Sequence, residues 1–282
     1  MSRRSLLFSP ADEPTLLRKA PETGADTVCF DLEDAVAPSR KADAREIVAS
    51  VLADDAFDPD CEVCLRVNPD AEIAATDLDA LGSDARLDAV MVPKAETPDD
   101  VLAVSELLAE RSRDVPILAL CESAAGVLHA EAIAATDGVD ALAFGAEDLA
   151  ADIGATRTTE GTEILHARQQ VVLAGAAADI DVIDTVYTDI EDRDGLADET
   201  SFALDLGYDG KMCIHPAQVA VVNDAFTPGV ERIAWARRII DGAAEATDAE
   251  TGVFRVDGEM VDAPLVAQAE RVRERARAAG VW

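Results

Sequence analysis

Short runs of apolar or β-branched residues recur between residues 5 and 214 of the chain. There are eight of them: Ser5–Ser9, Thr27–Asp31, Glu62–Val67, Ala89–Pro93, Ile117–Cys121, Ala141–Gly145, Val182–Val186 and Gly210–Ile214. Short apolar runs such as Ala141–Gly145, which no polar position interrupts, are typical of strands covered on both faces. The pattern therefore predicts eight buried strands of a parallel sheet.

Stretches rich in Ala, Glu, Arg and Leu separate most of these runs and are compatible with helices. Examples are Pro14–Ala20, Ser39–Asp54, Pro98–Arg111, Ala124–Ala135, Glu160–Ala178 and Glu199–Leu206. Strand and helix alternating eight times predict the α/β fold of a (β/α)8 TIM barrel. The main alternative is an open doubly wound sheet. That fold normally has a Gly-rich phosphate turn after the first strand, and Ser9–Pro14 (SPADEP) is not one.

The chain continues for nearly 70 residues beyond the eighth run. Val230–Ala246 has the pattern of a helix, Val253–Val261 that of a hairpin with an Asp257-Gly258 turn, and Leu265–Ala279 that of a charged final helix. We therefore expect a barrel over residues 1–228 and a hairpin-plus-helix appendage over residues 229–282. The appendage either covers its own barrel or reaches the mouth of a neighbouring subunit.

Carboxylates stand directly after two of the buried strands. Glu122 follows Ile117–Cys121, and Glu147 and Asp148 follow Ala141–Gly145. Parallel α/β folds place their chemistry at the carboxyl ends of the strands. We expect Glu122 and Asp148 to meet there and to hold a divalent metal ion. The alternative is that both are ordinary solvated loop acids of an acidic protein.

Ionisable or polar groups follow every predicted strand. They are Ser9; Asp31, Glu33 and Asp34; Arg66 and Asn68; Lys94 and Glu96; Glu122; Glu147 and Asp148; Asp184, Tyr187 and Asp189; and Lys211 and His215. In a barrel these groups converge on one face. The oxygen-rich set suits Mg²⁺ better than Zn²⁺, and the three histidines of the chain lack zinc-ligand spacing.

Arg66 ends an otherwise apolar run and must be paired if it is buried. Beside a metal it could bind a substrate carboxylate or stabilise a developing oxyanion. The alternative is an internal ion pair with Asp31 or Glu33.

The composition narrows the class of protein. A formal net charge of -33 argues against binding to nucleic acid or to anionic membranes. Only four residues are lysines, against 20 arginines, and such an acidic, lysine-poor surface suggests a halophilic host with high internal salt. No run of 18 apolar residues or targeting segment is evident, so we expect a cytoplasmic protein. The five cysteines imply no disulfide framework.

Several motifs together resemble one family along nearly the whole chain. They are Arg4–Pro10 (RSLLFSP), Asp31–Val36 (DLEDAV), Leu65–Pro69 (LRVNP), Val92–Glu96 (VPKAE), Cys121–Val127 (CESAAGV), Phe144–Leu149 (FGAEDL), Arg157–Gly161 (RTTEG) and Gly210–Pro216 (GKMCIHP). This set resembles the citrate lyase β-subunit-like family, which comprises malyl-CoA, citramalyl-CoA and citryl-CoA lyases within the HpcH/HpaI aldolase superfamily. One departure is Pro10-Ala11, where the family often has Pro-Gly, so the region around the CoA phosphates is expected to differ.

The resemblance implies a TIM barrel, Mg²⁺ or Mn²⁺, an acyl-CoA substrate and a homo-oligomer, either a trimer or a hexamer. It assigns the metal to Glu122 and Asp148, and binding of the substrate carboxylate or thioester oxygen to Arg66. Lys94 and Ser9 are expected to bind substrate, while Glu33, Asp34 and Glu147 are expected to support the site. The late motif Met260–Pro264 (MVDAP) makes Asp262 an acid/base residue of a neighbouring subunit's site.

The leading functional expectation is Mg²⁺-dependent carbon–carbon cleavage of a carboxylated 3-hydroxyacyl-CoA. Malyl-CoA would give acetyl-CoA and glyoxylate, a small 2-oxo acid, so that CoA enters as part of the substrate. One alternative is a malyl-CoA-type thioesterase that uses the same site. Others are a β subunit of a citrate lyase complex, which works with carrier and transferase chains, and a metal-dependent 2-oxo-acid aldolase that needs no CoA.

Overall fold

The computed structural model describes residues 3–83, 85–248 and 253–282. The chain forms two compact units, which divide inside helix α10 (Pro216–Phe226). Arg3–Asn223 forms one unit and Asp224–Trp282 belongs to the other. The sequence pattern had placed this division after residue 228.

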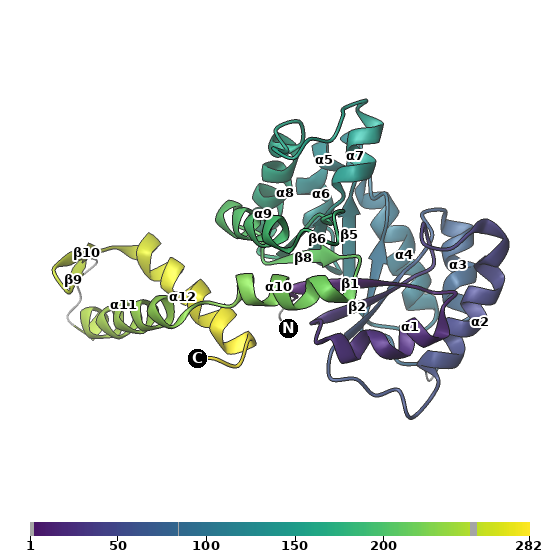
Figure 1. The fold of residues 1–282 in the computed structure, drawn as a ribbon, viewed down its shortest axis with the longest axis horizontal. Helices are drawn as coiled ribbons and strands as arrows, with labels where there is room; N and C mark the ends of the chain where they lie inside the picture. The colour runs from purple at the N-terminus through teal and green to yellow at the C-terminus, as the bar shows by residue number, and fades with distance from the viewer. Residues whose placement is uncertain (1–2, 84, 249–252) are drawn as a thin grey trace. The chain divides into compact units, whose positions relative to one another are not determined.

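Eight parallel strands of the first unit pair in chain order and close into a barrel (Figure 1). They are β1 (Ser5–Pro10), β2 (Thr27–Asp31), β3 (Glu62–Arg66), β4 (Ala89–Val92), β5 (Ile117–Cys121), β6 (Val139–Phe144), β7 (Asp181–Asp184) and β8 (Gly210–Cys213). Pairing of Ser5 with Lys211 joins the last strand to the first. The predicted (β/α)8 barrel is confirmed, and each predicted strand lies within a few residues of an observed one.

Alternate side chains of the strands fill the interior of the barrel. These residues form one buried cluster of Leu6, Cys29, Cys64, Ala89, Met91, Leu118, Leu120, Ala141, Ala143, Ile183 and Met212. The side chains between them point to the helices, because successive residues of a strand face opposite sides. Positions two residues beyond the last core residue of a strand, such as Asp31 after Cys29, therefore face the mouth of the barrel.

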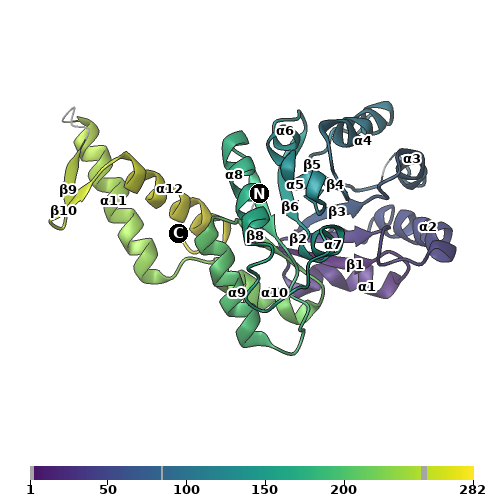
Figure 2. The ribbon, with the colours of Figure 1, turned by 90° about the horizontal axis from the view of Figure 1, so that it is seen from above.

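Helices surround the barrel on its outer side (Figure 2). They are α1 (Pro14–Lys19), α2 (Lys41–Leu52), α3 (Ala71–Asp79), α4 (Pro98–Glu110), α5 (Ala124–Leu128), α6 (Ala130–Ala134), α7 (Ala146–Asp152), α8 (Leu165–Ala178), α9 (Arg193–Leu206) and α10, with 3₁₀ turns η1 (Ala20–Thr23) and η2 (Pro38–Arg40). Local signals explain where several of them begin. Thr97 and Asp100 form a capping box on α4, with Pro98 in its first turn, and the Asp70 carboxylate caps α3.

The helix prediction was wrong in three places, one of which is α9, since this helix begins at Arg193 and not at Glu199. The stretch Ala124–Ala135 divides into α5 and α6 at His129, whose Nδ1 contacts the Glu96 carbonyl at 2.7 Å. Of the stretch Glu160–Ala178, only the part from Leu165 onward is an α-helix. The composition of both of these stretches is compatible with continuous helices. In the structure, the first is interrupted at His129 and the second begins with a loop. The helices α3, α7 and α10 were not among the predicted stretches.

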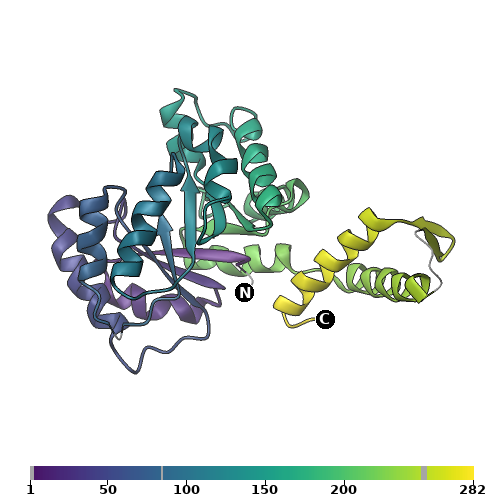
Figure 3. The same cartoon turned by 180° about the vertical axis from the view of Figure 1, so that it is seen from behind.

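The second unit contains helix α11 (Val230–Asp248), strands β9 (Phe254–Val256) and β10 (Glu259–Val261), and helix α12 (Ala263–Ala278) (Figure 3). The antiparallel strands turn through Asp257 and Gly258, which both have positive φ, as a two-residue hairpin turn requires. The small core of this unit includes Ala236, Ile239, Val261, Ala269 and Val272. The predicted hairpin between two helices is confirmed.

The five cysteines are all free thiols. Cys29 and Cys64 occupy paired positions on neighbouring strands and are both buried in the barrel core. Among the described helices, none has the length and apolarity needed to cross a bilayer.

Candidate active site

An arginine–carboxylate pair lies where β2 and β3 end. The guanidinium of Arg66 donates from Nε to Oδ1 of Asp31 at 2.8 Å and from Nη2 to Oδ2 at 2.5 Å, and the same Nη2 lies 3.5 Å from Oε2 of Glu33. The guanidinium carbon also lies 4.6 Å from the centre of the Phe8 ring. The internal ion pair considered from the sequence is therefore present. Nη1 makes no hydrogen bond to the residues that the structure describes, which leaves one face of Arg66 able to donate to a ligand.

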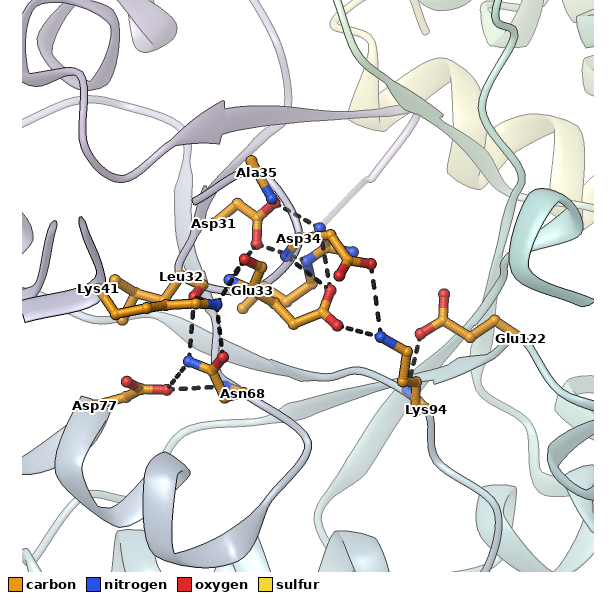
Figure 4. A network of polar contacts seen from close by, with 11 residues as sticks. Asp31, Leu32, Glu33, Asp34, Ala35, Lys41, Asn68, Asp77, Lys94 and Glu122 are labelled. Atoms are coloured by element: carbon orange, nitrogen blue, oxygen red, sulfur yellow. Dashed lines mark hydrogen bonds and ion pairs between the residues drawn. The ribbon is translucent and has the colours of Figure 1, made fainter. Parts of the chain in front are cut away.

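Lys94, on the loop after β4, joins two parts of the site (Figure 4). Its ammonium donates to Oε1 of Glu33 and lies 3.6 Å from Oδ2 of Asp34. Its backbone N–H donates to Oε1 of Glu122 at 2.9 Å. The residue has a φ of 50°, a left-handed conformation that is costly for a side chain other than glycine and is often found at functional sites.

The charged groups around Lys94 shift one another's pKa values. Burial raises the pKa of Glu33, against the hydrogen bond from Lys94 that lowers it. Burial also acts on Asp34, but the interactions with Glu33 and Lys94 prevail and hold its pKa below the usual range. The pKa of Lys94 is raised because the hydrogen bond and charge of Glu33 outweigh burial. Lys94 is therefore a cation, and Glu33 on the loop between β2 and α2 is its ion-pair partner.

Glu122 is a buried carboxylate with little to neutralise it. Its side chain is 5% exposed, and the described residues offer it one backbone N–H and no ion pair. Burial, together with the charge of nearby Asp148, raises its pKa to about 7. A Cβ on Gly145 would lie 2.5 Å from the Glu122 Cβ and 2.8 Å from Oε2, so the space that this carboxylate occupies exists only because residue 145 is a glycine.

Asp148 and Glu147 both lie in the first turn of α7, next to Gly145. Asp148 is exposed, and its negative charge contributes to the raised pKa of Glu122. Glu147 instead accepts a hydrogen bond from Nε of Arg157 at 2.9 Å, while Nη1 of Arg157 binds Glu163 at 2.5 Å. The partner of Glu147 is thus a cation of the loop after α7.

The carboxylates of Glu122 and Asp148 fit a divalent metal ion as donors. Oε2 of Glu122 accepts no hydrogen bond from the described residues, and the raised pKa marks a charge that a cation would stabilise. No group of three or more His, Cys, Asp or Glu side chains gathers as a metal cluster in the described ranges. Two protein carboxylates, with water and substrate completing the coordination, suit Mg²⁺.

Among the described residues, Ser9 and Asp262 make no side-chain hydrogen bond or ion pair with this group. Ser9 is 3% exposed and lies on the opposite face of β1 from Phe8, so its role in substrate binding stays a prediction. Asp262 belongs to the second unit, where it is exposed and caps α12 through the Leu265 N–H at 3.3 Å. The expectation that every strand-end group would converge was wrong for Asp184 and Lys211. They point outward and pair with each other at 2.7 Å.

Two residues that shape the site were missed. Gly145 was seen only as the end of an apolar run, and nothing local indicated that its missing Cβ accommodates Glu122. Lys41 was counted among the four lysines, but its ammonium binds the loop that carries Glu33 and Asp34. In a chain with so few lysines, one at the start of a helix was the available signal.

Comparison with known proteins adds to this geometry. The family model described as HpcH/HpaI aldolase/citrate lyase matches residues 4–216. A citrate lyase subunit beta-like protein of Deinococcus radiodurans is 39% identical over 94% of both chains. The mitochondrial citramalyl-CoA lyase of Mus musculus is 35% identical over 96% of this chain and 85% of its own. The crystal structure of CitE from Mycobacterium tuberculosis in complex with magnesium, acetoacetate and coenzyme A has a TM-score of 0.80 and 35% identity, and covers 98% of both chains.

Proposed function

The chain belongs to the HpcH/HpaI aldolase/citrate lyase family, and from this premise we propose that it is a divalent-metal-dependent carbon–carbon lyase. Its substrate would be a carboxylated 3-hydroxyacyl-CoA such as malyl-CoA, and its products acetyl-CoA and a 2-oxo acid. The observation that carries the proposal is Glu122, a buried strand-end carboxylate that makes no ion pair with the described residues. Burial and the charge of Asp148 raise its pKa to about 7, although the charge of Arg66 acts in the opposite direction. Relatives named citramalyl-CoA lyase, and one solved with magnesium and coenzyme A, support it.

We assign the metal, Mg²⁺ or Mn²⁺, to the carboxylates of Glu122 and Asp148. When bound there, it would supply a Lewis acid to the carboxylate and carbonyl of the 2-oxo acid half. Glu122 is suited to this role because Oε1 is oriented by the Lys94 N–H, which leaves Oε2 for the ligand bond. Gly145 keeps the space around that oxygen open.

Arg66 is assigned to the acyl-CoA half. In the cleavage, the hydroxyl gives up its proton to solvent as its carbon becomes the carbonyl of the 2-oxo acid. The bond between that carbon and the α-carbon breaks, its electron pair moves into the thioester to give an enolate, and the α-carbon then takes up a proton. Asp31 holds this guanidinium on two nitrogens, and Nη1, which no described residue binds, can donate to the enolate oxygen as its charge develops. The pairing with Asp31 prevents the guanidinium from reorienting when the ligand is absent.

Asp262 is assigned to the proton transfer at the α-carbon, in the site of a neighbouring subunit. Its carboxylate is exposed and directly follows the hairpin, and within the described part of the chain it accepts one long hydrogen bond, of 3.3 Å, from its own helix. This assignment requires a homo-oligomer, either a trimer or a hexamer, in which the unit that contains Asp262 completes another chain's barrel.

Incubation of the chain with malyl-CoA and Mg²⁺ tests the proposal. Glyoxylate and acetyl-CoA are the expected products, and citramalyl-CoA in a parallel assay would give pyruvate and acetyl-CoA. Free malate and CoA would establish a thioesterase instead. Relatives named citrate lyase subunit beta favour one further candidate, a subunit of a larger complex. In that case the isolated chain would turn over no CoA thioester.

A further inference from the structure

Lys41, the first residue of α2, binds the loop between β2 and α2 with its whole ammonium group. Nζ donates to the carbonyl of Leu32 at 2.6 Å, to the carbonyl of Glu33 at 2.7 Å and to Oδ1 of Asn68 at 2.7 Å (Figure 4). An ammonium has three N–H donors, so all are used. No carboxylate of the described residues pairs with it, and a cation at the start of a helix is opposed by the helix dipole. The contacts of Lys41 with the loop therefore explain why a lysine stands at this position.

The loop is held from its other side by Asp31. Oδ1 of Asp31 accepts the N–H of Glu33 at 2.8 Å, and Oδ2 accepts the N–H of Ala35 at 3.1 Å. The ammonium of Lys41 donates to the carbonyl oxygens of Leu32 and Glu33 in the same segment. Both backbone polar groups of Glu33 are thus bound, the N–H by a carboxylate and the carbonyl by an ammonium, while its side chain reaches Lys94.

Asn68 and Asp77 in turn hold Lys41 in place. Nδ2 of Asn68 donates to Oδ2 of Asp77 at 2.7 Å, and Oδ1 of Asp77 accepts from Nε of Arg45 at 2.7 Å. The Asp77 side chain is fully buried. Because an ammonium can only donate and a carboxylate can only accept, the Asn68 amide has one orientation that satisfies both neighbours. Helices α2 and α3 are thereby connected to the loop at the mouth of the barrel.

We propose that Lys41 is a positioning residue for Glu33. It fixes the Glu33 peptide so that the Glu33 carboxylate holds Lys94, whose backbone N–H orients Glu122. The catalytic consequence rests on the proposed lyase function, whereas the structural consequence does not. Outer residues that orient the groups of a metal site typically change activity by about 10- to 100-fold when they are replaced.

The structural consequence can be measured without substrate. Labelling with ¹⁵N-lysine gives at most four ammonium signals, from Lys19, Lys41, Lys94 and Lys211. Glu33→Gln identifies how the Lys94 signal moves when its partner loses its charge. Lys41→Met should move the Lys94 signal in the same direction and leave that of the fully buried Lys211 unchanged. Lys19→Met removes the same charge from an exposed position and serves as the matched control.

Activity on the CoA thioester provides the second measurement. Lys41→Met should lower kcat by about 10- to 100-fold and change the KM for the thioester little. Asn68→Ala removes one of the three ammonium contacts, so it should give a smaller change in both the Lys94 signal and kcat. This variant keeps the test usable if Lys41→Met does not fold.

The outcomes separate this inference from the function. An unmoved Lys94 signal in both Lys41→Met and Asn68→Ala would overturn the positioning role, whatever the activity. A kcat equal to that of Lys19→Met would overturn the catalytic consequence. If the unaltered protein cleaves no CoA thioester, the proposed function fails, while the shift of the Lys94 signal still decides whether Lys41 positions Glu33.

Discussion

Glu122 and Asp184 are both buried acids at the carboxyl ends of barrel strands, yet their surroundings differ. Asp184 is 0% exposed and binds two cations, Nε and Nη2 of Arg168 at 2.7 and 2.6 Å and Nζ of Lys211 at 2.7 Å. These cations hold its pKa below the usual range despite burial. Glu122 makes no ion pair with any described residue, and burial raises its pKa to about 7 although the charge of Arg66 acts against this.

The difference separates a structural charge from a functional one. A buried ion pair with satisfied hydrogen bonds has its charge balanced within the fold, so it does not indicate a ligand. A buried carboxylate that the fold leaves without a cation costs stability, so it indicates a ligand that supplies the missing charge. Strand geometry explains the outcome, because Asp184 points toward α8 and α9 whereas Glu122 points toward the mouth of the barrel.

The largest expected effect is the loss of catalysis when one of the two proposed metal ligands, Glu122 or Asp148, is replaced. Glu122→Gln or Asp148→Asn should lower kcat by about a thousandfold or more, which corresponds to ~4 kcal/mol, because each removes a ligand of the metal. Circular dichroism should show an unchanged fold. Exposed Glu131→Gln and Asp137→Asn are the matched controls and should keep normal activity. Normal turnover of Asp148→Asn at limiting Mg²⁺ would remove the metal assignment.

The same comparison predicts different effects of the two substitutions on stability. Asp184→Asn should lower the free energy of unfolding by about 3–5 kcal/mol, because it leaves Lys211 and Arg168 buried without a counter-charge. Glu122→Gln should not destabilise the Mg²⁺-free protein, because it removes a buried charge that has no partner. Urea unfolding at constant salt measures both. Equal losses in the two variants would show that the two carboxylates do not differ in this way.

A mixing experiment tests whether the mouth of the barrel is completed by another chain. Arg66→Ala and Asp262→Ala subunits should each be inactive alone. After unfolding and reassembly together they should recover about one quarter of normal activity, because a shared site needs one intact residue from each kind of subunit. Subunit exchange is checked with differently tagged chains. Exchange without recovery would place Asp262 in its own chain's site or outside the chemistry.

The smallest effect concerns Asp181, at the opposite end of the barrel. Burial and the charges of Asp209 and Asp140 raise its pKa to about 6, although Arg3 lies 3.6 Å away. A raised pKa means that the folded state disfavours the ionised form, so stability is lost as pH rises from about 4 through 6. Asp181→Asn should therefore stabilise the protein at pH 8 by less than about 1 kcal/mol, since the side chain is 40% exposed, and less so at pH 5. Thermal unfolding at both pH values measures this, and a larger gain at pH 5 would contradict it.

The barrel and part of the site could be predicted because the relevant signals are local. Apolar runs at regular spacing specify buried parallel strands, and a residue that follows such a strand lies near the mouth whatever the rest of the chain does. Glu122, Asp148, Arg66 and Lys94 were all found in this way. The Asp257-Gly258 turn was also readable, because two consecutive positive φ angles need residues of this kind.

What the sequence by itself determined is the alternation of elements and the residue types available at each strand end. Only the tertiary structure decided which of those charges are neutralised. Asp184 and Glu122 look alike in the sequence, but a one-residue difference in the side-chain alternation turns one toward Arg168 and Lys211 and the other toward Asp148. The roles of Gly145 and Lys41 likewise depend on contacts between residues 8 to 27 positions apart in the chain. Such contacts exist only after the strands and helices have packed.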